Sequence, residues 1–136
     1  MAIFNKVNAL VAALANGTHN LATNQLTVAL TSIAPTAANS VLADITQVAY
    51  TGMSARNITT TSSAQTAGVY RLILADLTLT QTTGTSASFR YAVIFNSTPA
   101  AGNLIGFYDY GSSLILNTGE SLLIDADNVN GLLQLT

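Results

Sequence analysis

The chain has 136 residues, which suits one domain, and only 7% of them are charged, against about 25% in an ordinary soluble domain. The chain has no cysteine and one histidine. These counts exclude a disulfide scaffold, a cysteine-type zinc site, a thiol nucleophile and a multi-histidine metal cage. The net charge of −2 is unlike the basic footprint of a nucleic-acid-binding protein. So sparsely charged a surface is either covered with Thr, Ser and Asn or buried against other subunits.

The first predicted element is a short helix within residues 1–17. Five apolar side chains at three- and four-residue spacing share one face, namely Ile3, Val7, Leu10, Val11 and Leu14. Asn16-Gly17 is a natural helix stop. A signal peptide is the alternative, but its basic region would be Lys6 alone and its apolar core very short. No run of about 20 apolar residues exists, so the sequence predicts no membrane span.

Residues 25–136 are predicted to form the β domain of this single-domain chain. Residues 25–31 alternate as a strand, 36–48 hold a helix of one or two turns, and 51–68 form a long loop or a flat strand. Further strands are predicted at 69–80 with a bulge at Ala75-Asp76, then at 89–95, 104–110, 114–116, 121–125 and 132–135. The pattern predicts a mainly β fold, an antiparallel sandwich or jelly-roll-like barrel with one short N-terminal helix.

The polar residues form no recognisable catalytic pattern. His19 has no Gly-x-Ser-x-Gly elbow to serve, so we interpret it as a capping or connector residue. The segment from Asp125 to Gly131 looks calcium-like, but Val129 and Thr136 occupy ligand positions. We interpret it as a turn, with a weak surface calcium site as the alternative. The six acids could form a glycosidase pair, but the chain is small and has no tryptophan. We therefore expect no catalytic residue, no cofactor and no metal, and no enzyme.

Six of the nine aromatic residues lie in two stretches, residues 89–96 and 104–111. On neighbouring strands they would form cross-strand aromatic pairs. We interpret them as sheet core, and the functional alternative is that one face is an interface, where Tyr and Phe are favoured.

The chain resembles a group of small virion structural proteins of tailed phages and prophages over nearly its whole length. The resemblance is carried by Leu42-Ala43-Asp44-Ile45, by residues 70–80, 89–96 and 104–111, by the opening Phe4-Asn5-Lys6-Val7 and by the ending 131–135. It implies a structural role: first a capsid decoration (cement) protein that binds the outer head surface and stabilises the shell, second a tail or neck subunit. The implied partners are the phage major capsid protein and further copies of this chain, as a homotrimer. The implied location is the virion, after synthesis in the bacterial host cytoplasm.

A third hypothesis is a carbohydrate-binding β module on the virion surface that uses Tyr108 and Tyr110. We expect the interface to involve Phe4, Val7 and Leu10 of the helix and the strand residues Tyr108 and Tyr110. The N-terminal helix or the segment 51–68 could be an arm that lies on the capsid or on a neighbouring subunit. No nucleic acid and no membrane is expected as a partner.

Overall fold

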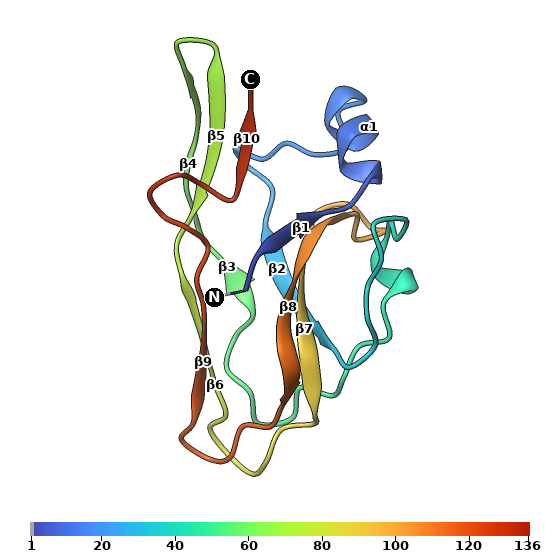
Figure 1. The fold of residues 1–136 in the computed structure, drawn as a ribbon, viewed down its shortest axis with the longest axis vertical. Coiled ribbons are helices and arrows are strands. Elements are labelled where there is room, and N and C mark those ends of the chain that lie inside the picture. Colours follow the sequence, from blue (N-terminus) through green and yellow to red (C-terminus); the bar gives the residue numbers. More distant parts are fainter. Residues whose placement is uncertain (1) are drawn as a thin grey trace.

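The computed structural model describes residues 2–136, and its strands form two facing layers (Figure 1). The first layer is a five-stranded sheet in the order β1-β8-β7-β2-β3, and the second contains a three-stranded sheet, β10-β5-β4, and a two-stranded sheet, β6-β9. All pairings are antiparallel. The bounds are β1 Phe4–Lys6, β2 Leu26–Thr31, β3 Asn57–Ile58, β4 Thr60–Thr66, β5 Val69–Leu74, β6 Leu77–Thr80, β7 Phe89–Asn96, β8 Leu104–Leu114, β9 Ser121–Ile124 and β10 Leu133–Leu135. The prediction of a mainly β, antiparallel, sandwich-like fold is confirmed.

The core is centred on β2 and β7. Every residue of β2 is buried, and so is every residue of β7 except Arg90. One face of this sheet packs against the second layer, and residues 32–56 cover the other face (Figure 1). That covering segment includes the one-turn helix η1, Leu42–Asp44, within the range where a short helix was predicted. Burial on both faces explains why Thr31, a polar residue, is completely inaccessible.

The edge of β2 opposite β7 is completed by individual backbone and side-chain groups instead of a full neighbouring strand. The short strand β3 pairs only with Leu26 and Thr27. Further along, the Val28 N–H donates to the Arg56 carbonyl at 2.9 Å, and the Arg56 guanidinium donates back to the Val28 carbonyl. The Leu30 N–H donates to the Tyr50 hydroxyl at 2.9 Å. This side of the sheet therefore leaves few unpaired backbone groups for another chain.

The predicted N-terminal helix is wrong over its first part. Phe4–Lys6 is the edge strand β1, paired with β8, and the only α-helix in residues 2–136 is α1, Ala9–Ala15. The strand forms because β8 leaves room for it: Gly106 faces Lys6, and a Cβ at Gly106 would collide with the Asn5 carbonyl oxygen and the Phe4 ring. Close approach of β1 therefore depends on this glycine. The predicted stop is confirmed, since α1 ends at Ala15 and Gly17 has φ of 78°.

The segment 51–68 was expected to be a long loop or a flat strand, and it contains both loop and strand. Residues 60–66 form the strand β4, which makes a hairpin with β5 through Ala67 and Gly68, both at positive φ. The hairpin extends past the body of the sandwich (Figure 1). At Ala75-Asp76, where a bulge was predicted, β5 ends and the chain changes partner, because β6 pairs with β9. The separate strand expected at 114–116 does not form, because β8 continues to Leu114 and residues 115–116 lie outside any strand.

Candidate interaction surface around β1

Exposed apolar side chains gather around β1. Seven large apolar residues are exposed in the described chain: Ile3, Val11, Ile33, Ile115, Leu123, Val129 and Leu135. All except Ile33 and Ile115 line three pockets that follow β1 along the open edge of the sandwich. We call the surface formed by these three pockets the β1 surface. Clustered exposed apolar side chains mark interaction sites in proteins.

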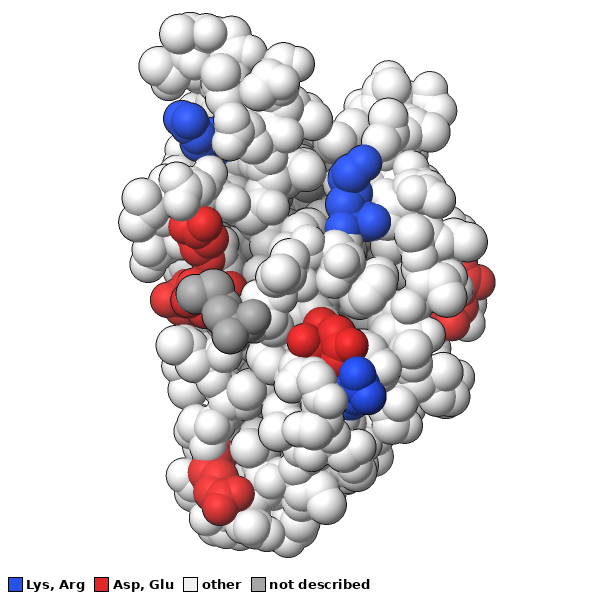
Figure 2. Space-filling view, viewed as in Figure 1, with Lys and Arg blue, Asp and Glu red and all other residues white. Residues whose placement is uncertain are grey.

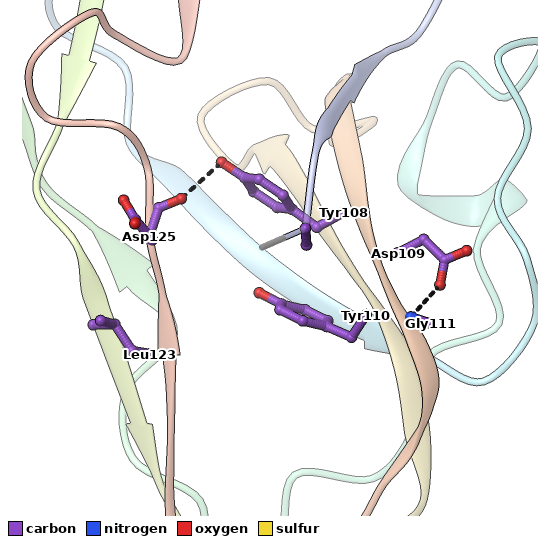
Figure 3. Close-up of a pocket in the computed structure, with 7 residues that line it drawn as sticks. Tyr108, Asp109, Tyr110, Gly111, Leu123 and Asp125 are labelled. Atoms are coloured by element: carbon purple, nitrogen blue, oxygen red, sulfur yellow. Dashed lines mark hydrogen bonds between the residues drawn. The ribbon is translucent and has the colours of Figure 1, made fainter.

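Two of the pockets join into one groove. They have volumes of about 440 and 570 Å³ and share Ala2, Tyr108 and Asp125. One wall comes from β1 and β8, and the other comes from β9 and the loop that follows it (Figure 3). We call it the tyrosine groove. Other residues that line it are Ile3, Phe4, Tyr110, Leu123, Asp127 and Val129.

Tyr108 and Tyr110 project into the groove from the same face of β8, because side chains two residues apart share a face (Figure 3). Their ring centroids are 6.4 Å apart, and the Phe4 ring lies 5.4 Å from that of Tyr108. The Tyr108 hydroxyl donates to the Asp125 carbonyl at 3.3 Å. Tyr110 is only partly buried, and its hydroxyl makes no hydrogen bond with residues 2–136. Tyr110 is therefore the aromatic group that remains available for binding.

The groove is electrostatically negative. Burial, followed by the charge of Asp125, raises the pKa of Tyr110 to about 12. Burial also raises the pKa of Tyr108, and Tyr110 and the carboxylates of Asp125, Asp127 and Asp76 add to the effect. Both hydroxyls are therefore neutral near pH 7, while hydrogen bonds from Asn130 hold the pKa of Asp127 below its ordinary value.

A neighbouring acid is already neutralised. Arg90 binds Asp109 through two hydrogen bonds, Nε to Oδ1 at 2.8 Å and Nη2 to Oδ2 at 3.0 Å. The Arg90 hydrogen bond is the main reason that the pKa of Asp109 is low. Within residues 2–136 this is the only salt bridge, so Asp76, Asp125 and Asp127 have no ionic partner there.

The calcium-like segment uses its carboxylates to shape a turn. Asp125 accepts the Asp127 N–H at 3.0 Å, and Asp127 in turn accepts the N–H groups of Val129 and Asn130. Asp76 reaches across to accept the Ala126 N–H at 3.0 Å. No group of three His, Cys, Asp or Glu residues within 2–136 is arranged to hold a metal ion. Hydrogen bonds to backbone N–H groups therefore set the positions of these carboxylates, and their negative charge lies beside the groove.

The third pocket is an apolar cleft of about 520 Å³ between α1 and β10. Leu10, Val11, Leu14 and Leu135 line it, together with Lys6. Around it the surface carries few charges, widely separated by uncharged side chains (Figure 2). No helix in residues 2–136 has the length and hydropathy needed to cross a membrane.

The predicted interface residues divide into two groups. Val7 and Leu10 are 0% exposed and Tyr108 is 4% exposed, so these three belong to the hydrophobic core and offer little surface of their own. Leu10 still lines the third pocket, and Tyr108 lines the groove. Phe4 and Tyr110 are partly exposed and lie in the groove. Of the two tyrosines expected at a carbohydrate site, Tyr110 is therefore the accessible one.

Sequence reasoning assigned none of the five exposed apolar members of this surface to an interface, namely Ile3, Val11, Leu123, Val129 and Leu135. Val129 carried a usable signal, because a large β-branched residue inside an Asp- and Asn-rich turn has no local structural role. His19, the other residue considered for chemistry, lies in the connector between α1 and β2.

The β1 surface thus offers apolar side chains, one accessible aromatic ring and unpaired carboxylates, a combination suited to holding a partner by burial and by charge. Comparison with protein-family models, with curated proteins and with solved structures found no match to this chain.

Proposed function

We propose that this chain is a non-enzymatic structural subunit of a tailed-phage virion that assembles through its β1 surface. The observation that carries the proposal is the gathering of five of the seven exposed large apolar side chains on that one surface. Complete burial of each such side chain contributes about 1.5–3 kcal/mol, so a partner that covers them gains a substantial contact. The resemblance described above supplies the identity of the assembly.

Within the virion, the proposed role is capsid decoration. A decoration protein binds many equivalent sites on the shell, so a modest contact in each copy stabilises the whole particle by avidity. The proposed partners are the major capsid protein and further copies of this chain in a homotrimer. A closed ring of three requires each copy to present two different patches, and the β1 surface would be one of them. A tail or neck position is the alternative within the same class.

The experiment uses particles made with and without this protein. We expect purified protein to have a trimeric mass in light scattering, to co-sediment with particles that lack it, and to raise their resistance to heat. Electron micrographs of labelled particles should show a lattice on the head. Rings or fibres on the tail would establish the alternative position. A monomer that ignores both heads and tails would overturn the proposal.

A further inference from the structure

Charge is unevenly distributed over the molecule, and the tyrosine groove has most of the negative charge. Four of the six carboxylates, those of Asp76, Asp109, Asp125 and Asp127, lie in it or act on its tyrosines. Arg90 neutralises Asp109, which leaves three carboxylates without an ionic partner among residues 2–136. In residues 2–136 the remaining cations, Lys6, Arg56 and Arg71, make no salt bridge. The groove is therefore complementary to a positive charge from outside.

The partly exposed ring of Tyr110 provides a second attraction for the same kind of group. The face of an aromatic ring attracts a guanidinium or ammonium ion, and the attraction grows when the pair is shielded from water. The Tyr110 hydroxyl is neutral and unbonded within residues 2–136, so its oxygen can accept a hydrogen bond from that cation. The ring and Asp125 line the same pocket (Figure 3).

The rim of the groove is apolar. Ile3 is 78% exposed, Val129 is 77% exposed, and Leu123 on β9 is 53% exposed. A small hydrated cation would not bury these side chains. An apolar neighbour would bury them, and burial of apolar surface lowers the free energy of the complex. The occupant therefore combines one positive charge with adjacent apolar surface.

We infer that the tyrosine groove receives an arginine or lysine side chain, flanked by apolar residues, from the protein subunit that this chain contacts in the virion. The inference rests on the proposed function and names the chemistry of its contact. The cation lies against the Tyr110 ring and the carboxylates of Asp125 and Asp127, and the apolar flanks cover Ile3, Leu123 and Val129.

The first test uses two capped peptides, acetyl-Gly-Leu-Arg-Leu-Gly-amide and the same peptide with glutamine in place of arginine. Each is titrated into the isotopically labelled full chain and followed by the amide NMR signals. We expect the arginine peptide to bind about tenfold more tightly and to move the signals of Tyr110, Leu123 and Asp125. Equal affinity for the two peptides, or signal changes confined to other regions, would overturn the inference.

Variants then separate the contribution of the Asp125 charge to the affinity from that of the Tyr110 ring. Asp125→Asn keeps an acceptor for the Asp127 N–H, and we expect it to weaken the arginine peptide about fivefold. Glu120→Gln removes the same charge outside the groove and should leave the affinity unchanged. Tyr110→Phe keeps the ring face and loses only the hydroxyl acceptor, so it should weaken binding less than Tyr110→Leu, which should lose several-fold affinity because the ring face is gone. If Glu120→Gln lost as much affinity for the arginine peptide as Asp125→Asn, the attraction would depend only on the net charge of the protein. That result would overturn the specific site.

The second test distinguishes this inference from the proposed function. If the wild-type chain binds particles and Asp125→Asn binds them equally well, the inference fails while the proposed function stands. If the wild-type chain ignores particles, the proposed function fails whatever the peptides show. Binding of a soluble oligosaccharide at Tyr110 without a response to the arginine peptide would overturn the inference in favour of a carbohydrate site. Groove signals that change only with the concentration of the chain itself would overturn it in favour of a second copy.

Discussion

Tyr50 and Arg56 act together where β2 lacks a neighbouring strand. The guanidinium carbon of Arg56 lies 3.6 Å from the centre of the Tyr50 ring, which aligns both side chains along the β2 edge. The Tyr50 hydroxyl accepts the Leu30 N–H and donates to Gln47 at 2.8 Å. Burial raises the pKa of Tyr50, so the hydroxyl keeps its proton for this donation.

Replacing Tyr50 by Phe leaves the Leu30 N–H without its partner. Since an unsatisfied buried donor costs about 1–3 kcal/mol, we expect Tyr50→Phe to lower the free energy of unfolding by that amount. Denaturant unfolding measures it. Tyr91→Phe is the matched control, because no hydrogen bond joins the Tyr91 hydroxyl to residues 2–136, and its effect should stay within about 0.5 kcal/mol. Equal losses in the two variants would contradict the role of the Tyr50 hydroxyl.

His19 is a buried residue in a network of neutral partners. Its exposed fraction is 6%, its Nδ1 accepts a hydrogen bond from Asn96 at 3.0 Å, and the same Asn96 nitrogen donates to Asn24 at 2.8 Å. The Thr98 N–H donates to Asn96 Oδ1, which fixes the orientation of that amide. The Nε2 atom is buried without a partner in residues 2–136. Burial lowers the pKa of His19, and a second proton on Nδ1 would point at the Asn96 donor.

The lowered pKa of His19 predicts a pH dependence of stability. The unfolded chain binds the proton near the ordinary pKa of 6.5, whereas the folded chain binds it only at lower pH. The stability that the neutral ring supports is complete above pH about 6.5 and falls as the pH drops from there towards the folded pKa. We expect the free energy of unfolding of the wild type to fall as the pH drops below the ordinary pKa of 6.5, and to fall less in His19→Gln. Parallel curves for the two proteins would contradict this prediction.

At the scale of elements, β1 is a short strand at one edge of the five-stranded sheet. It has three residues, it pairs on one side only, and it approaches β8 closely at Gly106. At the start of β1 the Phe4 ring packs on Tyr108. Just after its end the Val7 N–H donates to the Ile105 carbonyl at 3.2 Å. Because β1 forms part of the tyrosine groove, its position determines whether the groove exists.

Gly106→Ala should displace β1 from β8. The new methyl group meets backbone at Asn5, which cannot rotate away, so we expect a loss of about 1–3 kcal/mol in the free energy of unfolding. Hydrogen exchange should show faster exchange of the β1 amides. Gly111→Ala in the same strand has open space but a φ of 84°, so it should lower stability without changing exchange in β1. Unchanged protection of β1 in Gly106→Ala would contradict the close-approach argument.

At the scale of the whole molecule, exposed apolar side chains allow a direct test of the β1 surface. The double variant Leu123→Ser, Val129→Ser removes two of them, and we expect particle binding to weaken at least about tenfold because their burial is lost. Co-sedimentation measures it. The matched control is Ile33→Ser, Ile115→Ser, which removes two exposed apolar side chains outside the three pockets. A control that weakens binding as much as the test variant would show that general hydrophobicity, not the β1 surface, is responsible.

Local patterns predicted most strands correctly. Residues 89–95 and 104–110 are runs rich in apolar and aromatic side chains between turn residues, and the structure has β7 and β8 there. The prediction was wrong at residues 4–6 because the spacing of Ile3, Val7 and Leu10 fits a helix, while the partner of β1 lies about 100 residues away along the chain. Gly106, which interrupts an apolar strand, was the one signal that another backbone approaches there.

The candidate site was predicted in part. The period of two placed Tyr108 and Tyr110 on one face, but it could not show that Phe4 packs on Tyr108 and leaves only Tyr110 accessible. Nor could it show that Asp76, Asp125 and Asp127 lie beside those rings, since they come from different parts of the chain.

By itself, the sequence determined the strand-rich content, the end of the helix at Asn16-Gly17, the shared face of the two tyrosines and the scarcity of charge. These properties depend on consecutive residues, on periodicity and on the backbone preferences of turn residues. Only the tertiary structure decided that β1 pairs with β8, that Val7, Leu10 and Tyr108 are buried, and that an acidic groove opens beside Tyr110. Those properties depend on which distant segments meet, because burial and electrostatic potential are set by neighbours in space and not by neighbours in the chain.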